Sequence, residues 1–162
     1  MKDLLDKIGS YNLFNNLLPG ALFAAFVDAF SNIKLIQKDI IVGAFVYYFL
    51  GIIVSRFGSL IVEPLSKKLK FVKFAPYENY IIDSKNVPKL EILSVSNNMY
   101  RTFCALLLLI GLVILYDDAS KFFNWLNTYI SYICVFSLMV LFLFSYKKQT
   151  KFITKRIDAN LK

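Results

Sequence analysis

The sequence predicts an all-α, polytopic membrane protein with four transmembrane helices, and three observations lead to this fold class. Of its 162 residues, 57% are apolar, whereas soluble domains are about 45–50% apolar. These residues come in uninterrupted blocks, which suits a hydrocarbon solvent better than water. Lysines flank the blocks and give a net charge of +8. A chain of this length forms a single membrane domain, residues 1–162.

The first span is expected at residues 11–30, after a short amphipathic helix or a frayed terminus at residues 1–9. It is the most polar span, because it contains three asparagines and an aspartate, and Pro19-Gly20 is expected to interrupt it. Neighbouring helices can satisfy the backbone groups that proline frees. A re-entrant or interfacial segment is the alternative for this stretch.

The second span is expected at residues 39–62, after a short loop at residues 31–38. Residues 40–54 carry no charge. About 20 residues cross a ~30 Å hydrocarbon core, so Arg56 falls about one turn short of the inner surface. Because Pro64 cannot donate a backbone hydrogen bond, we expect the helix to end or kink there.

Residues 64–101 are the only long connection, and we expect helical pieces in it, a basic one at 64–73 and an aromatic one at 77–83. Asn86 is expected to cap a helix that begins at Pro88. That helix runs straight into the third span at residues 102–116. The helical ends of the second and third spans thus extend into the cytoplasm.

Asp117-Asp118 is expected to end the third span, and the fourth follows at residues 125–146, with tryptophan and tyrosine at its ends. A basic tail, residues 147–162, stays helical to about residue 157. Of the 19 basic residues, only Lys34, Lys38 and Lys121 lie in the two short loops. With four spans the others share one side, so both termini face the cytoplasm of a bacterial inner membrane; a three-span arrangement would divide them.

The sequence offers no catalytic chemistry, so we expect no enzyme, no metal and no cofactor. It has no histidine, and it contains no phosphate-binding glycine loop, carboxylate pair or metal-ligand cluster. A small transporter is a weak alternative, since no inverted repeat or mid-membrane acid is visible. Cys104 and Cys134 lie in apolar runs and are expected to be buried free thiols.

Arg56 and Glu63 are the candidate intramembrane polar residues, since a charge at a helix centre costs at least ~2.5 kcal/mol. They lie on nearly the same helix face with Ser59 between them, and could line a pore or hold a second subunit. The simpler interpretation is that Arg56 reaches out to lipid phosphates.

Gly51, Ser55 and Ser59 form a small-xxx-small face that permits close helix packing. The partner is another span of the same chain, which is the simpler interpretation, or a second copy in a homo-oligomer. Amides at the inner interface form another group, which caps helices or lines a vestibule: Asn12, Asn15, Asn16, Asn97 and Asn98.

Five basic residues of the tail alternate with apolar ones, and they are Lys147, Lys148, Lys151, Lys155 and Arg156. This pattern favours contact with anionic membrane lipid or with a cytosolic protein partner. Nucleic acid is not expected, because no stacking aromatics are interleaved in a binding pattern.

Three stretches, YNLFNNLLPG, IIVSRFGSLIVEPLSKKLKFV and NNMYRTF, resemble those of small uncharacterised multi-span membrane proteins of bacteria. Small proteins of this build also occur as membrane components of anti-phage defence systems. The resemblance implies a membrane effector or sensor that works with a cytosolic partner. The small-residue face, Arg56 in the membrane and the absence of catalytic chemistry favour a self-assembling form that forms a pore in the bilayer or perturbs it. A non-conducting anchor for a cytosolic partner is the alternative.

Overall fold

The computed structural model describes residues 13–77, 79–81 and 87–160, and within these ranges every regular element is a helix. In chain order the elements are η1 (Leu13–Leu17), α2 (Leu18–Phe30), α3 (Ile40–Phe57), η2 (Gly58–Val62), α4 (Glu63–Lys68), α6 (Pro88–Phe122) and α7 (Asn124–Asn160), where η marks a π-helix. The all-α prediction is therefore confirmed. The helix expected at residues 1–9, the predicted interface amide Asn12 and the predicted cap Asn86 lie outside the described residues.

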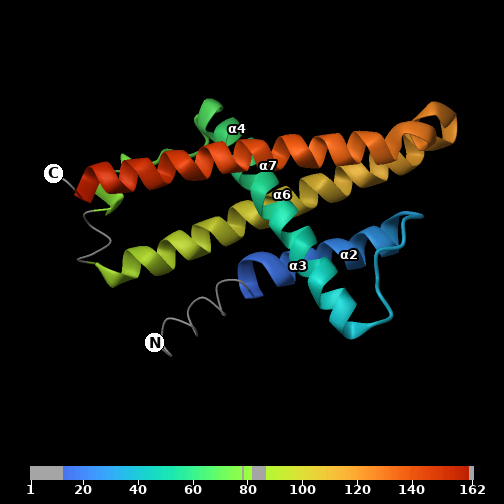
Figure 1. Cartoon of the computed structure of the whole chain (residues 1–162), viewed down its shortest axis with the longest axis horizontal. Coiled ribbons are helices and arrows are strands. Elements are labelled where there is room, and N and C mark those ends of the chain that lie inside the picture. Colours follow the sequence, from blue (N-terminus) through green and yellow to red (C-terminus); the bar gives the residue numbers. More distant parts are fainter. Residues whose placement is uncertain (1–12, 78, 82–86, 161–162) are drawn as a thin grey trace.

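The two longest helices, α6 and α7, run in opposite directions along the long axis of the molecule and spread apart from the corner that joins them (Figure 1). They contain 35 and 37 residues, which makes them about 52 and 55 Å long at 1.5 Å per residue. Both are therefore longer than the ~30 Å hydrocarbon core of a bilayer. Figure 1 also shows α3 crossing this pair obliquely.

The helix of the third predicted span does not stop at Asp117-Asp118 but continues to Phe122. Acidic residues do not break a helix when a cation one turn on can pair with them. Here Lys121 Nζ lies 2.8 Å from the Asp118 carboxylate. Phe123 alone then separates α6 from α7.

Residues 31–38 form the predicted loop, and it lies at the same end of the molecule as the corner between α6 and α7. The Asn32 amide donates a hydrogen bond of 2.9 Å to the Asp117 carboxylate. The Asp39 carboxylate accepts one of 2.9 Å from the Val42 N–H and so caps the start of α3.

Each of the two π-helices ends two residues before a proline, η1 before Pro19 and η2 before Pro64. A proline cannot donate to the carbonyl four residues earlier, and its ring crowds that carbonyl. The wider winding of a π-helix relieves this crowding, as where the Glu63 N–H bonds the Gly58 carbonyl. The expected interruption at Pro19-Gly20 is therefore absent, and the helix through Pro64 ends only at Lys68.

The end of α4 is closed by a Schellman motif. The Phe71 N–H donates to the Ser66 carbonyl and the Lys70 N–H donates to the Lys67 carbonyl, each at 3.0 Å. This arrangement needs a left-handed residue, usually glycine. Lys70 takes that conformation, with φ of 57°.

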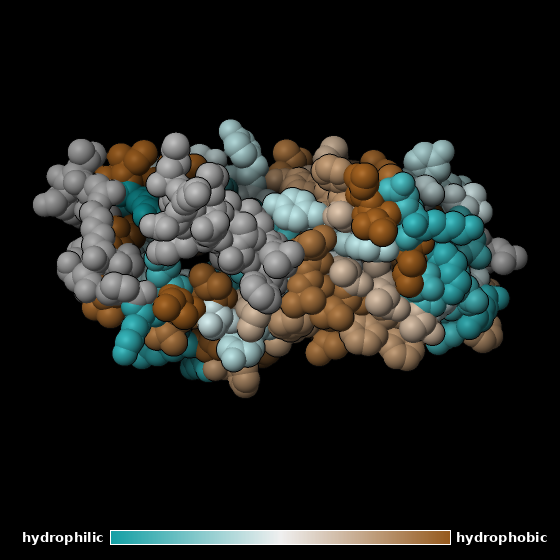
Figure 2. Space-filling view, turned by 90° about the horizontal axis from the view of Figure 1, so that it is seen from below, coloured by the Kyte–Doolittle hydropathy of each residue, from teal (hydrophilic) through white to brown (hydrophobic). Residues whose placement is uncertain are grey.

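Three helical stretches are long and apolar enough to cross a membrane, Ile40–Lys68, Lys89–Phe122 and Trp125–Asp158. They contain the second, third and fourth predicted spans. Figure 2 shows hydrophobic residues over the middle of the molecule and hydrophilic residues gathered at its right-hand end. The composition and the surface both indicate a membrane protein.

The buried core is small and lies where α3 meets α6, at Val54, Ala105, Leu106 and Ile110. α7 lies almost wholly outside it, because only 6% of its most apolar window is buried within the chain. Cys104 and Cys134 are free but exposed. The expectation that they are buried in the protein is wrong, since they lie on apolar surfaces that no other part of the described chain covers.

Candidate functional site

Glu63 lies at the centre of a charged cluster that joins three helices. Its Oε1 lies 2.7 Å from Lys67 Nζ within α4. Its Oε2 lies 2.7 Å from Arg101 Nη1 of α6 and 3.4 Å from Lys148 Nζ of α7. Because the Glu63 side chain is only 11% exposed, water and salt screen these ion pairs less than they screen pairs on an open surface.

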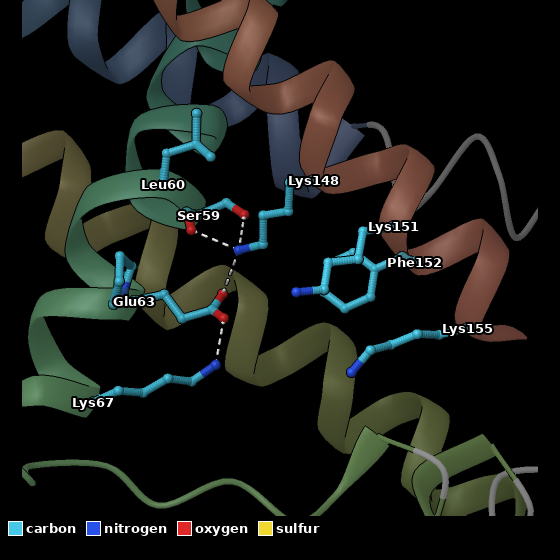
Figure 3. A pocket seen from close by; sticks show the side chains of 9 residues that line it. Ser59, Leu60, Glu63, Lys67, Lys148, Lys151, Phe152 and Lys155 are labelled. Atoms are coloured by element: carbon cyan, nitrogen blue, oxygen red, sulfur yellow. Dashed lines mark hydrogen bonds and ion pairs between the residues drawn. The ribbon is translucent and has the colours of Figure 1, made fainter.

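Pro64 explains why Lys148 reaches this position. In η2 the Glu63 N–H bonds to the Gly58 carbonyl, and the next residue, Pro64, has no N–H to offer. The Ser59 carbonyl is thereby left without a helical donor. Lys148 Nζ supplies one, at 2.6 Å from the Ser59 carbonyl oxygen and 2.8 Å from its Oγ (Figure 3).

A cavity of about 390 Å³ lies beside this cluster, between η2–α4 and α7. We term it the basic pocket, and its lining residues are Ser59, Leu60, Glu63, Pro64, Lys67, Lys148, Lys151, Phe152 and Lys155. Figure 3 shows how the lysines of α7 and Lys67 of α4 surround it. Four lysines face one carboxylate, so the pocket carries an excess of positive charge.

Aromatic rings support this pocket. The Phe152 ring lies 5.1 Å from the Tyr77 ring, measured between centroids, and 5.8 Å from Lys148 Nζ. Lys67 Nζ lies 4.1 Å from the centroid of the Phe74 ring. Such cation–π contacts hold ammonium groups in place, and the contact between the Tyr77 and Phe152 rings brings the segment after α4 against α7.

The chemistry available in this pocket is the binding of an anion. Ammonium groups donate strong, charge-assisted hydrogen bonds to phosphate or carboxylate oxygens. Within the described ranges, no group of three or more histidine, cysteine, aspartate and glutamate side chains could hold a metal ion. The pocket also contains no nucleophile beside a base, apart from the hydroxyl of Ser59, which already accepts a hydrogen bond from Lys148.

The predicted small-residue face divides between two contacts inside the chain. Gly51 is buried, and a Cβ atom there would overlap the carbonyl oxygen of Asn16 in η1. Ser59 binds Lys148, as described above. Ser55 is half-buried. The structure therefore uses both ends of this face to pack helices of one chain.

Arg56 and Glu63 do not form one seam. Arg56 makes no hydrogen bond or ion pair with any residue in the part of the chain that the structure describes. The reason is η2, whose wider turns rotate Glu63 away from the face that α-helical spacing predicts. Glu63 meets α6 and α7 instead.

The predicted amides have different surroundings. Asn15 is buried, and Asn16 contacts α3 at Gly51. Asn97 is exposed on α6, and the Asn98 carbonyl accepts a hydrogen bond of 2.8 Å from the Thr102 hydroxyl. Asn12 lies outside the described residues.

The predicted basic residues of the tail also separate. Lys148, Lys151 and Lys155 line the basic pocket. Lys147 and Arg156 are exposed elsewhere on α7. The helical period explains this selection, because positions 148, 151, 152 and 155 share one face.

Sequence reasoning missed Lys67 and Arg101 as partners of Glu63. Lys67 follows Glu63 by four residues on one helix, a spacing that favours an ion pair. Arg101 directly precedes the charge-free run 102–116 and so lies at the depth where the second span also ends. Aligning the spans by depth could have found this pair.

No protein-family model, curated protein or solved structure matches the chain.

Proposed function

We propose that this protein is an oligomeric integral membrane protein that acts as an effector or sensor of the bacterial cytoplasmic membrane. Four segments insert into the bilayer, and the first of them is the span expected at residues 11–30. The basic end faces the cytoplasm, and so do both termini.

The observation that carries this proposal is the uncovered apolar face of α7. Val135, Phe136, Met139, Leu143 and Phe144 are each more than half exposed. Burying one such side chain is worth about 1.5–3 kcal/mol, so this face requires lipid or another copy of the chain. The first segment differs, since α2 packs against α3 and α6 and buries Ala24 and Val27.

Orientation follows from charge. The end with the 31–38 loop and the α6–α7 corner carries four acidic residues, Asp28, Asp39, Asp117 and Asp118, against three lysines, Lys34, Lys38 and Lys121. The opposite end carries the basic pocket. Segments rich in lysine and arginine stay on the cytoplasmic side.

Cross-linking through Cys134 tests the oligomer, because this free thiol lies exposed on α7. We expect a bifunctional thiol reagent to produce covalent dimers in membranes. Dimers should persist in Cys104→Ser and disappear in Cys134→Ser. A monomer by size in mild detergent, with no dimer through either thiol, would contradict self-assembly.

The effector function needs a separate measurement. We expect expression of the protein, alone or under phage challenge, to depolarise the membrane, as read by a potential-sensitive dye, and to reduce plaque formation. An oligomer that changes neither quantity would refute the effector role. Phage is chosen as the challenge because the resemblance expected from the sequence includes components of anti-phage defence systems.

A second candidate function is a non-conducting anchor for a cytosolic protein. It is favoured by exposed apolar residues beyond the charged cluster, Ile92 and Leu93 on α6 and Ile153 and Ile157 on α7. A stoichiometric soluble partner that Ile153→Glu/Ile157→Glu releases would support this function.

A further inference from the structure

An apolar groove adjoins the basic pocket. Its volume is about 580 Å³, it lies between α3–η2 and α7, and its lining residues are Phe57, Leu60, Ile61, Phe136, Ser137, Val140, Leu141 and Phe144. Leu60 also lines the basic pocket. The two cavities are therefore neighbours along one side of α7, with an apolar lining followed by a basic one.

The order of these linings matches the order of layers in a bilayer. The groove uses α7 residues 136–144, inside the charge-free run 122–146, whereas the pocket uses residues 148–155. In a membrane the groove thus faces hydrocarbon, and the pocket begins where lipid headgroups lie. Basic pockets between membrane helices on the cytoplasmic side suit anionic headgroups.

We propose that the two cavities together bind one anionic phospholipid, with its phosphate in the basic pocket and an acyl chain in the groove. This inference rests on the membrane location in the proposed function. The Lys151 and Lys155 ammonium groups, which form no ion pair with any described residue, donate to the phosphate oxygens. Lys148 stays on Ser59 and Glu63 and supplies positive charge from behind.

The charges of the pocket select the headgroup. Four lysines repel the ammonium of a zwitterionic lipid, and they attract a lipid whose only charge is its phosphate. A free phosphate ion would satisfy the lysines but would leave the adjoining groove unfilled. The ligand is therefore an amphiphile with a net negative head.

The lysines provide the first test. Each basic residue near a lipid surface contributes about fivefold in affinity, so Lys151→Gln/Lys155→Gln should weaken binding by about 25-fold. The matched control is Lys68→Gln/Lys147→Gln, which removes the same charge from exposed positions outside the pocket. The control should weaken binding by less than threefold.

Glu63 provides the second test, with the opposite sign. Its carboxylate offsets the positive charge that Lys67 and Lys148 present to the phosphate, so Glu63→Gln should strengthen binding by about fivefold. Glu91→Gln, at an exposed position of α6 outside the pocket, is the control and should leave binding unchanged. A merely structural role for Glu63 would instead give weaker binding.

The groove provides the third test. Ser137→Trp fills it, while Ser131→Trp places the same side chain at an exposed position of α7 outside it. We expect about tenfold weaker binding in the first variant and no change in the second. This comparison separates the acyl-chain site from general effects of a larger side chain.

The measurement is native mass spectrometry of the full chain in mild detergent, titrated with phosphatidylglycerol. Phosphatidylcholine with the same acyl chains tests the headgroup, and glycerol 3-phosphate tests the headgroup without chains. We expect phosphatidylglycerol to bind at least tenfold more tightly than either. Only variants whose helix content, measured by circular dichroism, equals that of the unmodified protein are compared. If the variant of one test fails to fold, the other two tests decide.

Three results would overturn the proposal. The first is equal binding of phosphatidylglycerol and phosphatidylcholine. The second is full competition by glycerol 3-phosphate, which would indicate a site for a soluble anion. The third is equal weakening of binding by Lys151→Gln/Lys155→Gln and by Lys68→Gln/Lys147→Gln. Cross-linking through Cys134 remains a separate readout. If the protein forms cross-linked dimers but does not select phosphatidylglycerol, the lipid-site inference alone is refuted. If it selects phosphatidylglycerol but forms no dimers, self-assembly alone is refuted.

Discussion

Substitution of Gly51 by alanine tests the helix packing most sharply. A Cβ atom at this position would overlap the Asn16 carbonyl oxygen and approach its backbone carbon atoms. The added Cβ atom is fixed to the backbone of α3 and the Asn16 carbonyl belongs to the backbone of η1, so no side-chain rotation can relieve the overlap. Restoring an ordinary carbon–oxygen separation of about 3.3 Å requires η1 to move away from α3.

The expected cost follows from two opposing terms. Overpacking of a close contact destabilises by roughly 1–3 kcal/mol, and this contact lies at the upper end because backbone must move. Alanine in a helix returns roughly 0.5–1 kcal/mol relative to glycine. We therefore expect Gly51→Ala to lower the free energy of unfolding by about 2 kcal/mol.

Gly111→Ala is the matched control. It makes the same substitution on α6, and a Cβ atom there meets nothing within 4 Å. We expect it to be neutral or to stabilise by up to about 1 kcal/mol. Unfolding by sodium dodecyl sulfate in mixed micelles, followed by circular dichroism, measures both variants. Equal effects of the two substitutions would refute the close α3–η1 contact.

Substitutions at three further positions have defined outcomes in the same unfolding assay. Lys70→Gly should stabilise the protein by about 1 kcal/mol, since glycine takes the left-handed conformation at no cost; a loss of stability would contradict the motif. Asp39→Ala should destabilise by about 1 kcal/mol by removing the cap on the Val42 N–H, whereas Asp39→Asn should retain most of the cap. Lys148→Met should destabilise by about 2 kcal/mol, because it leaves the Ser59 carbonyl unsatisfied, and a neutral result would exclude that bond.

The membrane helices could be predicted because hydrocarbon imposes simple demands. Charge-free runs at 40–54 and 102–116 fix two of them, since each backbone must satisfy its own hydrogen bonds in lipid. Their ends were harder to place. Asp117-Asp118 continues a helix because Lys121 follows at a favourable spacing.

The charged cluster could be predicted only in part. The Glu63–Lys67 spacing is visible in the sequence, but the Arg101 and Lys148 contacts depend on how three helices cross. Pro19 and Pro64 predict points of irregularity. Neither proline by itself indicates that the turn before it widens into a π-helix, and such a turn changes the register of every residue after it.

Thiol labelling in intact bacterial cells tests the central claim most directly, namely that the long helices cross hydrocarbon with the basic end inside. In a Cys104→Ser/Cys134→Ser background, an impermeant maleimide should label Asn127→Cys, beside the α6–α7 corner, in intact cells. It should label Lys151→Cys, in the basic pocket, only after the membrane is permeabilised. Equal labelling of both positions in intact cells, or recovery of the protein without detergent, would contradict the account.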